Sequence, residues 1–93
     1  MKRYVGYVEE IDWDANMCKV RIPNIDGLQE ISRIDPAMAI LVQKKTQTAD
    51  LEEADIPFHM QGLRIGDIVY CLDSEEENDT YTLVGFYGGT ADK

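Results

Sequence analysis

Residue types that perform catalysis are few and scattered in this sequence. His59 is the single histidine, and Ser32 and Ser74 are the only serines that it could activate. A hydrolytic triad needs a nucleophile, a base and an orienting group in one pocket, and no spacing here indicates such a set. Cys18 and Cys71 each lie in an apolar, strand-like run, so we expect buried free thiols instead of a disulfide or a zinc site. The sequence predicts no catalytic residues.

Acidic clusters provide the only pattern that is similar to a metal site. Residues 12–16 read Asp-x-Asp-x-Asn, like the opening of a calcium-binding loop, whose sixth and twelfth positions should be Gly and Glu. Those positions are Met17 and Pro23, so the pattern fails. The acidic run at residues 73–79 is typical of a solvated hairpin tip. We therefore expect no metal and no cofactor.

Apolar and β-branched residues predict four strands in two hairpins. The first hairpin joins residues 4–11 to residues 17–22 through a turn rich in Asp and Asn. Apolar and basic residues alternate along its second strand, which indicates one buried and one exposed face. The second hairpin joins residues 68–72 to residues 80–87. The uninterrupted apolar run at 68–72 is typical of a strand covered on both faces.

The segment between the hairpins allows more than one interpretation. Asp35-Pro36 is a typical helix start for residues 36–45. Residues 40–42 fit a short buried strand equally well, and we favour the strand because no polar face recurs at helical spacing. Residues 46–61 are polar and acidic, and we expect a long surface loop that is anchored by Phe58 and has room for a helical turn.

This pattern of a hairpin, a long connection and a second hairpin predicts an all-β fold. With four or five short strands, the best match is a small five-stranded Greek-key barrel, the OB-fold. We place one OB-fold domain at residues 1–89 and a loose C-terminal tail at residues 90–93. No stretch approaches the roughly 18 apolar residues that span a bilayer, so we expect a soluble chain without membrane insertion.

Charge is distributed unevenly along the chain. The net charge is −9, and residues 46–93 carry all of it, with Arg64 and Lys93 as the only basic residues of that half. A field of this sign opposes binding to phosphate backbones. A locally basic face around Lys19, Arg21 and Arg33 is the one surface that would allow nucleic-acid binding. Because the overall charge opposes it, we predict that the protein does not bind nucleic acid.

The order of several short motifs resembles the OB-fold domain of spike and baseplate proteins from contractile phage tails, and of the valine-glycine-repeat proteins of type VI secretion. The motifs are Gly6-Tyr7-Val8, the turn at 12–16, Lys19-Val20-Arg21-Ile22-Pro23, Gly27, the run at 66–71 that opens with Gly-Asp, and the glycine-rich end at 83–89. The match covers roughly half of the chain in the right order. An aromatic expected near Asp73 and a proline in the last strand are absent.

The resemblance implies a non-enzymatic structural module that joins hub and spike components of a tail baseplate or tail tip. It implies other tail proteins as partners, a homo-oligomer with a trimer favoured, and a location in the virion after synthesis in the host cytoplasm. The alternative is a stand-alone OB-fold that binds single-stranded nucleic acid or an oligosaccharide. Candidate interaction residues are Trp13, Ile25, Leu28, Ile31, Phe86 and Tyr87. The sequence fits an intramolecular position equally well for each of them, over the barrel mouth for Trp13 and in the core for the others.

Overall fold

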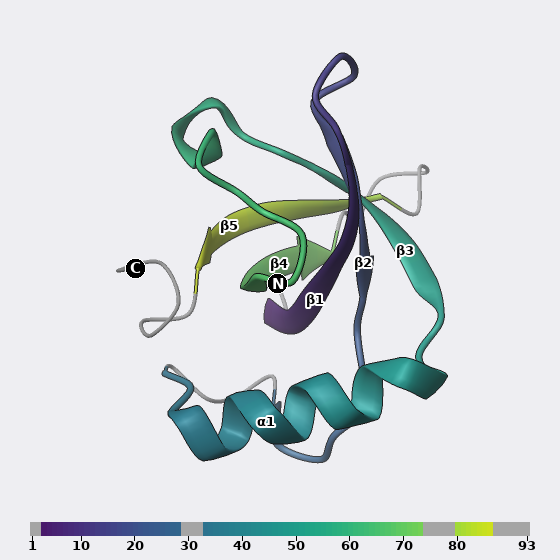
Figure 1. Cartoon of the computed structure of the whole chain (residues 1–93), viewed down its shortest axis with the longest axis vertical. Helices are drawn as coiled ribbons and strands as arrows, with labels where there is room; N and C mark the ends of the chain where they lie inside the picture. Colours follow the sequence, from purple (N-terminus) through teal and green to yellow (C-terminus); the bar gives the residue numbers. More distant parts are fainter. Residues whose placement is uncertain (1–2, 29–32, 74–79, 87–93) are drawn as a thin grey trace.

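Five strands close into a barrel in the computed structural model, which describes residues 3–28, 33–73 and 80–86 (Figure 1). The strands are β1 (Arg3–Asp12), β2 (Met17–Arg21), β3 (Leu51–Asp55), β4 (Ile68–Asp73) and β5 (Tyr81–Phe86). Their order around the barrel is β1-β2-β3-β5-β4. Neighbouring strands are antiparallel except β3 and β5, which are parallel. The predicted all-β, five-stranded barrel is confirmed.

The long strand β1 belongs to both halves of the barrel. Its first half pairs with β4 and its second half with β2, and the register shifts between Val8 and Glu10. At this irregularity the Gly66 N–H donates to the Val8 carbonyl at 2.8 Å, and the Val8 N–H donates to the Asp67 carbonyl at 3.0 Å. Gly66 has a φ of +96°, which a residue with a Cβ rarely adopts. The bend in β1 is therefore held by the residues just before β4.

Strand β4 is covered on both sides, as its continuous apolar run predicts. Val69 and Cys71 belong to the barrel core, whereas Ile68 and Tyr70 belong to a second core. Side chains alternate between the two faces of a strand, so β4 forms the wall that separates the two cores. The barrel core also contains Val8, Cys18, Val20, Ala54, Ile56, Met60, Leu63 and Leu83. The second core also contains Val5, Leu28, Ile34, Ala39 and Val42.

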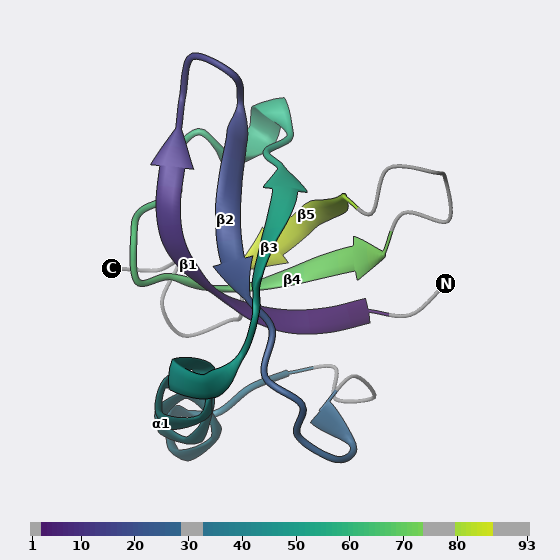
Figure 2. The same ribbon diagram turned by 90° about the vertical axis from the view of Figure 1, so that its right-hand side faces the viewer.

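Residues 36–45 form a helix, so the favoured prediction of a strand was wrong. Helix α1 spans Pro36–Lys45, and the Asp35 carboxylate caps it by accepting a hydrogen bond from the Met38 N–H at 2.8 Å. It lies against one end of the barrel in both views (Figures 1 and 2). Ala39 and Val42 face the second core, while Ile40 remains 55% exposed. Because apolar residues also occupy the solvent-facing side of α1, the sequence of this segment shows no helical periodicity.

The acidic segment at residues 46–61 is not a loop throughout, which corrects a second prediction. Leu51–Asp55 forms β3, which pairs with β2 along its whole length and with β5 at Ala54 and Asp55. Glutamate and aspartate are poor strand formers, and Ala54 is the one fully buried residue of β3. Pairing with β2 outweighs this local preference. Short 3₁₀ helices flank the strand at Thr46–Thr48 and Phe58–Met60.

Phe58 does not anchor this segment, because its side chain is 89% exposed. Met60, two residues later, is 1% exposed and packs in the barrel core. The predicted boundary at residue 89, the tail at 90–93 and most of the acidic run at 73–79 lie outside the described residues. None of the helices in the described ranges is long and apolar enough to cross a membrane.

Candidate functional site

The outward side chains of β1, β2 and β3 form one continuous surface, which we call the outer face. Cys18 and Val20 point into the barrel, so their neighbours on β2 point outward. The register places Lys19 beside Glu10 on β1 and beside Glu53 on β3. OB-folds bind their ligands on the surface of strands 2 and 3 and on the adjacent loops. The outer face is therefore the candidate site.

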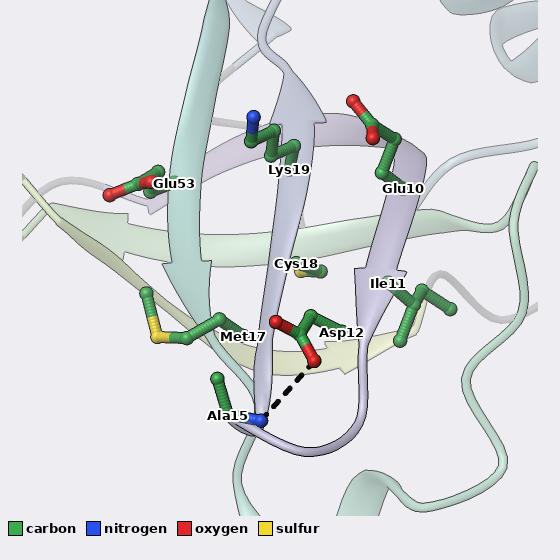
Figure 3. A pocket seen from close by; sticks show the side chains of 8 residues that line it. All are labelled: Glu10, Ile11, Asp12, Ala15, Met17, Cys18, Lys19 and Glu53. Carbon is green, nitrogen blue, oxygen red and sulfur yellow. Dashed lines mark hydrogen bonds between the residues drawn. The ribbon is translucent and has the colours of Figure 1, made fainter.

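A shallow hollow of about 370 Å³ lies on the outer face next to the β1–β2 turn (Figure 3). Its lining residues are Glu10, Ile11, Asp12, Ala15, Met17, Cys18, Lys19 and Glu53. Figure 3 shows the Lys19 amine on the same side of the sheet as the Glu10 and Glu53 carboxylates, which flank it. Three carboxylates against one ammonium make the lining negative, so the hollow favours cationic groups over anions.

The locally basic face that would have supported nucleic-acid binding does not form around β2. The Arg21 guanidinium contacts the Glu9 carboxylate at 3.3 Å and donates to the Ala49 carbonyl at 2.7 Å. Lys19 is bordered by carboxylates on both neighbouring strands. Arg33 lies near the start of α1, away from the outer face. The outer face is therefore acidic overall.

The β1–β2 turn is held firmly by hydrogen bonds. The Asp12 carboxylate accepts from the Asp14 N–H at 3.1 Å and from the Ala15 N–H at 3.4 Å, as its turn sequence predicts. The Asn16 carbonyl accepts from the Ile56 N–H at 2.9 Å, which ties the turn to the chain after β3. Trp13 sits on this turn with 41% of its surface exposed. A large aromatic is thus presented on a fixed support, which lowers the entropy lost on binding.

The structure separates the other predicted interaction residues from Trp13. Leu28 is 3% exposed and belongs to the second core, with Ile25 packed partly against it. Phe86 is packed partly against the barrel core. Ile31 and Tyr87 lie outside the described residues. Trp13 is the candidate that is both exposed and adjacent to the outer face.

Sequence reasoning missed six exposed apolar side chains among the described residues, of which Leu51 and Val84 are the two on strands, 37% and 39% exposed. Phe58 and Ile65 are 89% and 66% exposed, and Ile40 and Leu41 on α1 are 55% and 37% exposed. Their residue types do not indicate exposure, because an isolated apolar residue in a sequence is more often buried than exposed. The signal for the α1 pair was the Asp35 cap, since a helix through these residues has to turn some of them outward.

The two cysteines are unsuited to nucleophilic chemistry. Both are buried and free, as predicted. Burial, reinforced by the Asp55 carboxylate, raises the pKa of Cys18 to about 11. Burial, reinforced by Cys18, raises the pKa of Cys71 to about 12. Since the thiolate is the reactive form, both thiols are inert near neutral pH. In the described part of the chain, no three His, Cys, Asp or Glu side chains are placed so that they could hold one metal ion.

Comparisons with known protein families, with curated proteins and with solved structures give no match to this chain.

Proposed function

We propose that this protein is a non-enzymatic assembly module of a bacteriophage tail baseplate or tail tip, or of a phage-like contractile device, and that it joins hub and spike components through protein contacts. The observation that carries the proposal is Trp13, which is exposed on a hydrogen-bonded turn at the edge of an acidic outer face. Tryptophan on a rigid support is a frequent anchor of protein interfaces.

The chemistry of the outer face supports a protein partner over the ligands that OB-folds often bind. Single-stranded nucleic acids bind to basic grooves that carry aromatic side chains for base stacking. The outward residues of β2 are Met17, Lys19 and Arg21, and those of β3 are Leu51, Glu53 and Asp55. This set contains no aromatic residue, and Tyr7, which lies opposite Arg21 on β1, packs against the second core. The basic residues of the set are bordered by carboxylates. An acidic surface with methionine and leucine is better suited to a protein with basic side chains.

The tail assignment rests on the motifs of the resemblance. One of them has a clear structural role: Gly66-Asp67 closes the bend of β1 through two backbone hydrogen bonds. The positive φ of Gly66 explains why glycine stands at this position. The motif is therefore part of how the barrel closes.

The test is whether the chain is a stoichiometric component of tail particles. Particles sedimented from a culture that produces them are analysed by quantitative mass spectrometry, with a tagged copy of the wild type or of Trp13→Ala supplied in the same cells. We expect the wild type in particles at a fixed ratio to the tail hub, and a strong reduction for Trp13→Ala despite an unchanged circular dichroism spectrum. Absence of the wild type from the particles would overturn the tail assignment. Tight binding of the purified protein to an oligosaccharide or a single strand would favour the ligand-binding alternative.

A further inference from the structure

Two exposed apolar patches on this barrel carry opposite charge at their borders. The first, which we call the tip patch, is centred on Trp13 at the β1–β2 turn. Asp12 and Asp14 flank Trp13 in the turn, and the register sets Asp12, Met17 and Asp55 side by side across β1, β2 and β3. The three aspartates are exposed. The tip patch is thus an aromatic centre with an acidic border.

The second, which we call the helix patch, lies on the outer side of α1. Ile40 and Leu41 are 55% and 37% exposed, because Ala39 and Val42 occupy the side that faces the second core. Residues four apart are neighbours on a helix, so Lys44 follows Ile40 and Lys45 follows Leu41 along the surface. Both lysines are exposed and lie in the last turn. The helix patch is an aliphatic centre with a basic border.

The two patches lie at opposite ends of the molecule. In Figure 1 the β1–β2 turn is at the top and α1 at the bottom, and the view turned by 90° in Figure 2 shows the same separation. They therefore cannot meet within one molecule. They complement each other between molecules, because an aromatic anchor meets an aliphatic surface while aspartates meet lysines around it.

We propose that the tip patch of one copy docks onto the helix patch of a second copy. This inference rests on the proposed function, since it names a second copy of this chain as one partner of the assembly module. The contact is heterologous: each copy uses one patch as donor and the other as acceptor. Repetition of the contact builds a ring if the rotation between copies closes, and an open stack if it does not. A closure after three copies would produce the trimer that the resemblance implies.

Size exclusion with light scattering at physiological ionic strength tests the contact in the purified full chain. We expect the wild type at high micromolar concentration to exceed the mass of one chain. Trp13→Ala and Ile40→Glu should each weaken association about thirtyfold, the effect of losing a hot-spot residue of about 2 kcal/mol. Ile65→Glu is the matched control, because Ile65 is 66% exposed but belongs to neither patch. It should associate like the wild type.

Mixing variants distinguishes this arrangement from a symmetric dimer. Trp13→Ala keeps an intact helix patch and Ile40→Glu keeps an intact tip patch, so the mixture should form a one-to-one dimer although each variant alone is monomeric. A symmetric contact between two helix patches would instead persist in Trp13→Ala alone, and that result would overturn the proposal. Circular dichroism confirms that both variants are folded.

A charge exchange tests the borders of the patches. Lys44→Asp with Lys45→Asp should abolish association, and adding Asp14→Lys with Asp55→Lys to the same chain should restore it. Asp12 is left unchanged because it caps the turn. A wild type that stays strictly monomeric, with no dimer in the mixture, would overturn the second-copy contact. The same protein found in tail particles would still support the proposed function, so the two failures are distinguishable.

Discussion

Helix α1 lies in the connection between the two hairpins, and separate alanine substitutions of Val42 and Ile40 test whether this helix forms. In α1, Val42 is fully buried while Ile40 is 55% exposed. In a strand the two side chains, being two residues apart, would share a face. Unequal effects of the two substitutions are therefore a direct signature of the helix.

The size of the difference follows from the burial of Val42. Val42→Ala removes two methyl groups from the second core, which costs roughly 1.6 kcal/mol in transfer free energy at ~0.8 kcal/mol per group, and the remaining cavity adds to this cost. The higher helix propensity of alanine offsets about 0.5 kcal/mol. We expect a net loss of about 2 kcal/mol in the free energy of unfolding. Ile40→Ala should change it by less than about 0.5 kcal/mol.

Thermal unfolding followed by circular dichroism measures both variants against the wild type. For a domain of this size each kcal/mol corresponds to about 4–8 °C, so Val42→Ala should lower Tm by roughly 8–16 °C. Urea titration gives the free energy of unfolding independently. Equal losses for the two variants, or a larger loss for Ile40→Ala, would refute the helix and with it the helix patch.

Three further predictions follow from the backbone, the thiols and the surface charge. Gly66→Ala should destabilise the protein by about 1 kcal/mol in urea titration, because φ at Gly66 is +96°. Gly62→Ala is the control, because the added Cβ would meet open space, and it should change the free energy of unfolding by less than about 0.5 kcal/mol. Equal effects of the two substitutions would contradict the role of Gly66 in the bend. The raised pKa values of Cys18 and Cys71, about 11 and about 12 against 9.0 for an ordinary thiol, mean that the unfolded chain loses these protons first as pH rises. The stability that the neutral thiols contribute should therefore be complete below pH 9.0 and fall steadily from there towards pH 12. A urea concentration at the unfolding midpoint that does not change across this pH range would contradict the burial of the thiols. Fluorescence anisotropy should detect no binding to single-stranded DNA at physiological salt; micromolar affinity with a steep salt dependence would contradict the acidic outer face.

Local pattern was enough to predict both hairpins and the orientation of the side chains on β2. Cys18 and Val20 alternate with Lys19 and Arg21, and the structure places the first pair inside the barrel and the second outside. The apolar run that forms β4 indicated cover on both faces, and β4 does separate the two cores. These features depend on residues close together in the sequence, because strand alternation and turn chemistry are local properties.

Only tertiary contacts determine that residues 51–55 form β3, that residues 36–45 form α1, and which side chains meet on the outer face. The sequence at 51–55 favours a loop, and β3 forms because β2 supplies a complete set of backbone partners. The sequence at 36–45 fits strand and helix alike, and α1 is selected because Ala39 and Val42 complete the second core beneath β4. Pairing of β2 with β3 places Glu53 beside Lys19 in the acidic hollow, although the two residues are far apart in the sequence. Such contacts depend on which segments become neighbours in space, and hydrophobic pattern in one segment carries no information about its distant partner.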